Sequence, residues 1–169
     1  MSLFLSLGLT TPAGLSAAQI PHYGPAALIF HFIFAYGVLS SRTLKQIWGL
    51  DHNGSPREDL TKYGEAAVQS GKITRAQLNM LRRNEAASAN SVENYTLLVA
   101  AVGMASLAGV DKVVVNQAVA VYTIARIFYG AAYILIESDR WSQIRGVCWW
   151  VGNLTCLTLL WKAGGLLSG

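Results

Sequence analysis

Four long apolar segments, almost free of charged residues, constrain this chain more than any other feature of its sequence. Three contain no charged residue and the other contains only Arg126; the segments are residues 24–41, 94–110, 113–136 and 146–161. Extended into its flanks, each segment reaches about 20 residues, which as a helix spans a hydrocarbon core of about 30 Å. We therefore expect four transmembrane helices.

The composition also favours a membrane protein over a soluble one. Of the 169 residues, 13% are charged and 53% are hydrophobic, whereas soluble domains carry about 25% charged residues. A soluble four-helix bundle is the alternative, but it needs a polar face on each helix, which these segments lack. A net charge of +4 without a dense basic face argues against nucleic-acid binding.

Signals for helix starts and ends place the helices within the chain. Pro25 suits a first helical position and Gly109 a helix end, and the candidate caps are Ser55, Thr74, Asp111 and Ser142. We predict helices over residues 24–48, 75–108, 112–137 and 142–163, and a polar loop with a short helix over residues 49–74. Residues 1–20 contain no Lys or Arg, so we expect a retained segment rather than a cleaved signal. We expect residues 1–169 to form a single membrane domain.

The basic residues predict the orientation in the membrane. Of the 13 Lys and Arg residues, eight lie within residues 42–83, and Arg140 and Arg145 lie between the last two helices. The opposite side has only Lys112 and Lys162. By the positive-inside bias, we expect both basic loops to face the cytosol and both termini to face the lumen or exterior.

Polar residues within the third apolar segment share one helix face. Tyr122, Arg126, Tyr129, Tyr133 and Glu137 recur at spacings of 4, 3, 4 and 4, which places them on one side of a helix. An ionisable side chain inside an apolar helix costs at least about 2.5–3.5 kcal/mol on insertion scales, so it normally faces protein or water. We interpret this face as a functional site or a buried polar network. The alternative is that the tyrosines lie at the membrane interface and the arginine snorkels toward it.

The second long helix carries a complementary polar face. Arg83, Asn90 and Glu93 recur at spacings of 7 and 3, beside the small residues 86–89, which let another helix approach closely. We expect Glu93 to pair with Arg126, because a buried carboxylate and guanidinium tolerate the bilayer best when they are paired. A purely structural ion pair is the alternative to a ligand site.

These side chains suit a small anionic, polar ligand near the cytosolic face. Arg42, Arg126 and Arg145 suit carboxylates, and Asn90 and Glu93 suit amide and amino groups. A hydrophobic co-substrate would arrive laterally from lipid. The sequence holds no pattern typical of a catalytic triad, a phosphate loop or a metal site, so we expect no metal. Three further residues are interpreted as packing residues: His31, Cys148 and Cys156.

Two stretches of the sequence resemble the MAPEG family, the membrane-associated proteins in eicosanoid and glutathione metabolism. The first is A-x-x-N-x-x-E-N at residues 87–94, on the predicted second helix, and the second is R-x-x-Y-x-x-x-Y at residues 126–133, on the third. Topology and length agree as well, so the resemblance covers essentially the whole chain. The polar loop with Ser55-Pro56-Arg57-Glu58-Asp59 is most similar to fungal members.

The resemblance implies an all-α, integral membrane four-helix bundle that assembles as a homotrimer in the endoplasmic reticulum. Glutathione would bind between adjacent subunits near the cytosolic side, and a lipophilic small molecule would come from the membrane lipids. On matching positions, the residues implied to bind glutathione are Arg42, Asn90, Glu93, Arg126, Tyr129 and Tyr133. Those implied to be catalytic are Arg126, Tyr129 and Arg145, the last matching the arginine credited with activating the thiol.

One departure from the family pattern keeps several functions open. Members with glutathione chemistry usually have an arginine four residues before the motif asparagine, and here that residue is Ala86. The leading expectation is a glutathione-dependent transferase, peroxidase or isomerase. The alternatives are a glutathione-independent isomerase or cyclase of a hydrophobic metabolite, and a non-catalytic lipid-presenting protein.

Overall fold

A computed structural model describes residues 7–10 and 20–169, so most of the N-terminal segment expected to be retained lies outside the described residues. The described chain is helical. Its elements are α2 (Gly24–Ile33), η2 (Phe34–Val38), α3 (Arg42–Ile47), η3 (Asp59–Tyr63), α4 (Gly64–Gln69), α5 (Arg75–Leu107), α6 (Lys112–Leu135) and α7 (Asp139–Leu167).

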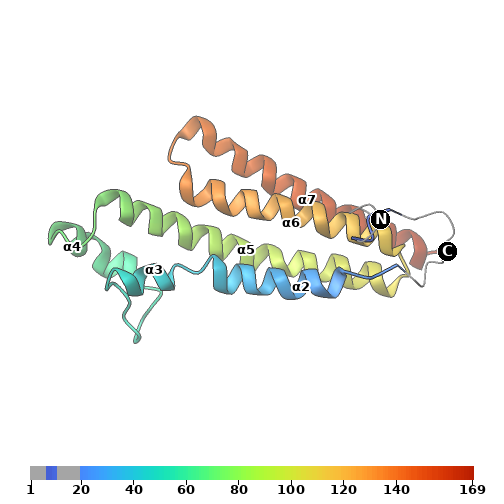
Figure 1. Cartoon of the computed structure of the whole chain (residues 1–169), viewed down its shortest axis with the longest axis horizontal. Coiled ribbons are helices and arrows are strands. Elements are labelled where there is room, and N and C mark those ends of the chain that lie inside the picture. Colours follow the sequence, from blue (N-terminus) through green and yellow to red (C-terminus); the bar gives the residue numbers. More distant parts are fainter. Residues whose placement is uncertain (1–6, 11–19) are drawn as a thin grey trace.

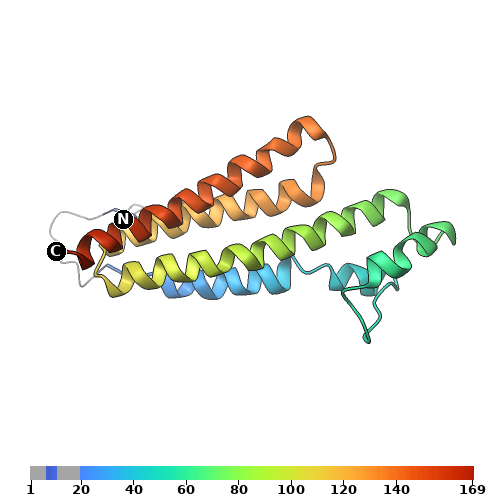
Figure 2. The same ribbon diagram turned by 180° about the vertical axis from the view of Figure 1, so that it is seen from behind.

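The long helices form an elongated bundle of two pairs. Figure 1 shows α2 beside α5 and α6 beside α7, and the reverse view in Figure 2 agrees. The α6–α7 connection and the α3–α4 region lie toward the same end, while the C-terminus lies at the other end. The two basic loops of the sequence therefore share one end of the bundle, as the positive-inside argument requires.

Several helix ends follow from local sequence signals. Thr74 and Gln77 form the expected capping box, with the Gln77 amide nitrogen 3.2 Å from the Thr74 hydroxyl and the Thr74 amide nitrogen 2.8 Å from the Gln77 side-chain oxygen. Gly109 follows the end of α5 with φ of +77°, a conformation that favours glycine. Asp111 caps α6 by accepting a 2.7 Å hydrogen bond from the Val113 amide. These three predictions are confirmed.

The predicted continuous helix over residues 24–48 is wrong in its middle. Regular α-helix ends at Ile33, a wider π-turn follows as η2, and the chain bends before α3 begins. Side chains of α5 bind carbonyls at this break: Asn84 Nδ2 donates to Leu39 O at 2.7 Å and Ser88 Oγ donates to Ala35 O at 3.2 Å. Because these carbonyls have partners outside their own helix, the interruption is tolerated.

Two predicted caps and one helix end are also corrected. The last helix begins at Asp139 with Ser138 at its N-cap position, and Ser142 lies within its first turn, where its hydroxyl donates to Asp139 O at 2.6 Å. The short loop helix begins at Asp59 rather than after Ser55. The Asp59 side chain forms a buried ion pair with Lys45, which is described below. The third long helix ends at Leu135, two residues before the predicted end.

Two clusters of buried apolar residues hold the bundle together. The cluster within the long helices is Leu98, Ala101, Val102, Ala105, Val110, Val115, Val119, Tyr122, Cys156, Leu159 and Ala163. The cluster under the loop is Leu50, Leu60, Ala67, Ile73, Leu78 and Leu81. The loop therefore has its own small hydrophobic core and packs as an ordered part of the fold.

The outer surface of the long helices is apolar. Within the described residues, Gly24–Ile47 and Lys112–Leu135 are long and apolar enough to cross a membrane. Large hydrophobic side chains are exposed on all four long helices, for example Ile29 (63%), Leu107 (86%), Phe128 (61%) and Trp161 (85%). Extensive exposed apolar surface marks contact with a membrane or a partner. The fold is an all-helical membrane bundle, as the sequence predicts.

Candidate functional site

The buried arginine of α6 is held by cross-helix hydrogen bonds. Arg126 is only 2% exposed, and its Nη2 donates to Ser91 Oγ at 2.9 Å and to Asn90 Oδ1 at 3.2 Å, both on α5. Its Nη1 is buried and has no hydrogen-bond partner among the described residues. Contacts with α5 thus fix one edge of the guanidinium, while the other edge carries a buried donor that is unsatisfied within the described chain.

Two tyrosine rings from the helix face predicted by spacing lie in a row next to this arginine. The Arg126 Cζ lies 4.3 Å from the centroid of the Tyr129 ring, and the Tyr129 and Tyr133 centroids are 5.4 Å apart. Arg145 of α7 completes the row, with its Cζ 4.5 Å from the Tyr133 centroid. Cation–π contacts of this kind favour a guanidinium over an aromatic face. The four residues Arg126, Tyr129, Tyr133 and Arg145 form what we call the seam.

The expected Glu93–Arg126 ion pair does not form within the described chain. Arg126 contacts Asn90 and Ser91 instead, and Glu93 is exposed. At about 100° per residue, Glu93 lies about 160° around α5 from Ser91, so the two side chains point to opposite sides. Spacing alone placed Glu93 with Asn90, but the rotation of α5 in the bundle brings Asn90 and Ser91, and not Glu93, within hydrogen-bond distance of Arg126.

A second polar network joins three helices and was not predicted as such. The Tyr122 hydroxyl donates to Asn94 Oδ1 at 2.8 Å, and Asn94 Nδ2 donates to Asn153 Oδ1 of α7. His31 packs edge-on against Tyr122, as a packing residue would, and its Nε2 lies 2.9 Å from Thr123 Oγ1. The four-residue spacing of Asn90 and Asn94 was the available signal for this network. Its contacts link the helices at the level of Arg126.

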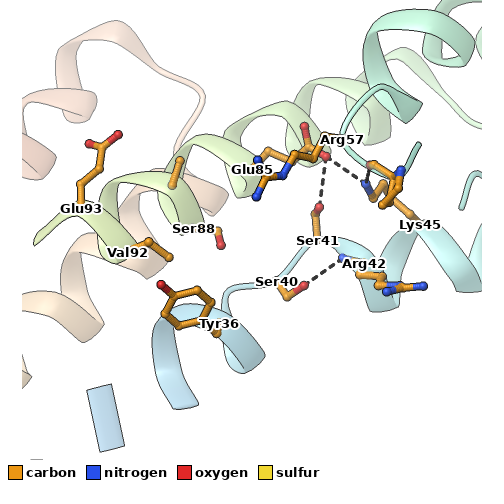
Figure 3. A pocket seen from close by; sticks show the side chains of 12 residues that line it. Tyr36, Ser40, Ser41, Arg42, Lys45, Arg57, Glu85, Ser88, Val92 and Glu93 are labelled. Atoms are coloured by element: carbon orange, nitrogen blue, oxygen red, sulfur yellow. Dashed lines mark hydrogen bonds and ion pairs between the residues drawn. The ribbon is translucent and has the colours of Figure 1, made fainter. Parts of the chain in front are cut away.

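A cavity of about 580 Å³, lined in part by charged side chains, lies between the break after α2, the loop and α5 (Figure 3). Of the predicted site residues, Arg42 and Glu93 line it. The full lining is Tyr36, Ser40, Ser41, Arg42, Lys45, Pro56, Arg57, Glu85, Ser88, Ala89, Val92 and Glu93. Arg57 was not predicted as a site residue, because nothing in its sequence neighbourhood shows that the loop folds back over α5.

A buried ion-pair network fixes the loop wall of this cavity. Lys45 Nζ lies 3.1 Å from Asp59 Oδ2 and 3.1 Å from Glu85 Oε1, and it donates to Pro56 O at 2.6 Å. Asp59 is fully buried and also accepts from the His52 backbone amide at 3.1 Å. Burial by itself raises the pKa of Asp59, but hydrogen bonds from Lys45 and His52 outweigh it and hold the pKa below its usual value. Charged groups thus tie α3, the loop and α5 together.

A narrower groove of about 340 Å³ lies between α5 and α7. Asn90 and Glu93 line it, together with Asn94, Asn153 and the Trp149–Trp150 pair. Glu93 thus borders both hollows. The predicted site residues fall into two groups: Arg42 and Glu93 are among the residues that line the cavity, whereas the seam lies on α6 and α7. Asn90 stands between the groups through its contact with Arg126.

The fold and these sites define a class: a helical membrane protein with a cationic and aromatic seam and a cavity lined in part by charged side chains. Comparison with protein families also identifies a family of membrane proteins. The model of the MAPEG family matches residues 20–165, so the chain belongs to the MAPEG family. This family includes glutathione transferases, peroxidases and isomerases. No curated protein and no solved structure matches the chain in the same comparisons.

Proposed function

We propose that this protein is a glutathione-dependent membrane enzyme, a transferase, peroxidase or isomerase acting on a lipophilic small molecule. The observation that carries the proposal is the unpartnered edge of Arg126, a buried guanidinium in a seam that includes a second arginine. A buried arginine with free donors suits an anionic group, because a charge-assisted bond there replaces an otherwise unsatisfied donor. Glutathione brings carboxylates and an ionisable thiol.

The division of the site residues supports a homotrimer with its sites between copies. Arg42 and Glu93 line the cavity on one side of α5, while Tyr133 and Arg145 lie on the α6–α7 pair. A ring of copies that meet head to tail brings the cavity face of one chain against the seam of the next. Each ligand would then contact residues of two chains.

The residues of both groups fit the chemistry of glutathione. The Glu93 carboxylate suits its α-ammonium group and the Asn90 amide suits a peptide group. Arg42 is already engaged, with Nη2 donating to Asn53 Oδ1 at 2.7 Å and Nε 3.6 Å from Asp51 Oδ2. Its proposed role with a carboxylate therefore requires exchange of these contacts.

The proposed catalytic roles belong to the seam. The positive charges of Arg126 and Arg145 would stabilise the thiolate form of glutathione, and the Tyr129 hydroxyl would donate to an oxyanion that develops on the second substrate. That substrate would enter from lipid past the exposed apolar faces of the helices. Fixed donors in a site that excludes water stabilise charge more strongly than water does.

The test is a glutathione titration of the purified protein, followed by absorbance of the thiolate and by conjugation of a generic aryl halide. We expect binding at millimolar glutathione or below, a thiolate signal, and loss of that signal in Arg145→Gln. Absence of binding at millimolar glutathione would refute the proposal.

A second candidate function keeps the site but not glutathione. Ala86 stands where family members with glutathione chemistry usually have an arginine, which favours a glutathione-independent isomerase or cyclase with Arg126 and Tyr129 as acid and base groups. A non-catalytic lipid-presenting role is compatible with the same observation. Turnover of a lipophilic substrate without added glutathione would support the second enzyme.

We also propose that the chain crosses the endoplasmic reticulum membrane four times with both basic loops in the cytosol. The gathering of these loops at one end of the bundle supports it (Figure 1). A glycosylation acceptor added after Gly169 should be modified in microsomes, and the acceptor triplet already present at Asn53-Gly54-Ser55 should not. Modification at Asn53 without modification after Gly169 would contradict this topology.

A further inference from the structure

The loop supplies the cavity with a cation that has no partner. Three basic side chains line the cavity, and two of them are engaged: Lys45 with Asp59 and Glu85, and Arg42 with Asn53. The exposed side chain of Arg57 makes no hydrogen bond or ion pair with any residue in the described ranges. Figure 3 shows it extending along Glu85 toward the Ser88 side, whereas the Arg42 guanidinium points away.

The neighbours of Arg57 hold it in this place. The carbonyl of Pro56, the preceding residue, accepts a 2.6 Å hydrogen bond from Lys45 Nζ, and Asp59, two residues after Arg57, is buried against the same ammonium. Glu85 beside it is bound by Lys45 and by the Ser41 hydroxyl at 3.3 Å. The negative charge of Glu85 is therefore offset locally, and the guanidinium remains available to another anion.

The distance along α5 between Glu85 and Glu93, which both line the cavity, indicates which anion fits. Glu85 and Glu93 are eight residues apart on α5, which is about 12 Å along a helix. A fully extended tripeptide with ordinary peptide links spans about 10–11 Å, and glutathione can extend further because its γ-glutamyl link runs through the glutamyl side chain. Glu93 attracts an ammonium group, so the end of glutathione that carries only a carboxylate would lie near Glu85 and Arg57.

We propose that Arg57 binds the glycyl carboxylate of glutathione and so selects the tripeptide over its shorter precursor dipeptide. This assignment rests on the proposed function. The loop arginine supplies a guanidinium beside the α5 wall of the cavity, and the described α5 residues in this wall include no arginine. A guanidinium binds a carboxylate through two parallel hydrogen bonds, which lysine cannot reproduce.

The test compares two ligands, glutathione and γ-glutamylcysteine, which lacks the glycyl residue. Binding is measured by calorimetry on the purified full-length protein and on Arg57→Gln. We expect Arg57→Gln to bind glutathione at least about tenfold more weakly, the loss of one charge-assisted contact, and to bind γ-glutamylcysteine as the wild type does. Arg57→Lys should recover only part of the loss. Lys62→Gln, a loop cation outside the cavity lining, is the matched control and should change neither affinity.

Each other outcome has a definite meaning. The assignment of Arg57 is wrong if the wild type binds glutathione but Arg57→Gln lowers the affinity for both ligands equally. It is also wrong if Arg57→Gln lowers neither affinity. In both cases the proposed function stands. If the wild type binds neither ligand, the proposed function fails and the assignment of Arg57 falls with it. Unchanged oligomer size of Arg57→Gln on gel filtration excludes loss of the fold as the cause.

Discussion

Arg126 lies over the ring of Tyr129, with the guanidinium carbon 4.3 Å from the ring centroid, and both side chains are buried inside a helix pair of a membrane protein. This contact fixes the plane of the guanidinium, while Ser91 and Asn90 bind one of its nitrogens. The other terminal nitrogen of Arg126 is buried and has no hydrogen-bond partner among the described residues, so the arginine is held in place with one donor unsatisfied.

Replacing either partner of this contact should abolish turnover without dissociating the oligomer. Arg126→Ala removes a positive charge that would stabilise the thiolate, and we expect a loss of about 10²–10³-fold in kcat, similar to the loss of one fixed donor to developing charge. Tyr129→Phe keeps the ring and removes only the hydroxyl. Activity with an aryl halide and oligomer size by gel filtration are the two measurements. Dissociation of Arg126→Ala into monomers would favour a structural role for the arginine.

The amide pair of Asn94 and Asn153 should contribute to stability in the membrane region. Asn153→Leu leaves the buried Asn94 amide without its acceptor, and we expect a loss of about 1–2 kcal/mol, measured as a lower melting temperature in detergent. The double variant Asn94→Leu with Asn153→Leu should cost less than the sum of the single changes. Thr155→Val is the control, since the exposed Thr155 hydroxyl bonds only to Val151 O of its own helix. Additive effects would show that the two amides are not coupled.

The buried ion pair of Lys45 and Asp59 should hold the loop against α5. Asp59→Asn leaves the Lys45 ammonium buried with less compensation, a change that costs about 3–5 kcal/mol in buried pairs. We expect faster proteolysis and faster hydrogen exchange within residues 50–58. Because the pKa of Asp59 is lowered, this stabilisation is present at neutral pH and is lost as pH falls below the ordinary value for aspartate. Glu58→Gln, which changes an exposed neighbouring residue, is the control. It should leave the rates of proteolysis and hydrogen exchange of the loop as in the wild type.

Glu65 should remain ionised to unusually low pH. The hydrogen bond from Arg75 at 2.7 Å, with a second from Arg82 at 3.1 Å, lowers the pKa of Glu65 to about 2. The α4–α5 ion pairs are therefore fully present above the ordinary glutamate pKa and are lost as pH falls through about 2. An NMR titration of the Glu65 carboxyl carbon measures the midpoint, and Arg75→Gln should raise it. An ordinary midpoint in the wild type would mean that the contact is absent in solution.

Sequence reasoning found the features that depend on local signals. The Thr74 capping box, the Asp111 cap and the one-sided row from Arg126 to Tyr133 follow from short spacings, which a helix converts directly into position. Arg145 was placed by resemblance to a family, and the structure brings it to Tyr133.

The features that failed depend on contacts between helices. The break after Ile33 is stabilised by Asn84 and Ser88 of another helix, which donate to the Leu39 and Ala35 carbonyls, while Gly37 is a weak local signal for it. The Glu93–Arg126 pair was wrong because spacing does not fix the rotation of α5 relative to α6. Arg57 was missed because its position depends on Lys45 and Asp59 folding the loop back.

Mixed trimers test the central claim, that glutathione binds between the cavity of one chain and the seam of another. Glu93→Gln and Arg145→Gln are co-expressed with different affinity tags, and trimers that carry both tags are titrated with glutathione. Neither variant should bind alone, because all its sites lack one group. In a ring that contains both variants, one interface joins an intact Glu93 to an intact Arg145, so we expect one bound glutathione per mixed trimer. Mixed trimers that bind none, beside a wild type that binds, would contradict a site shared between chains.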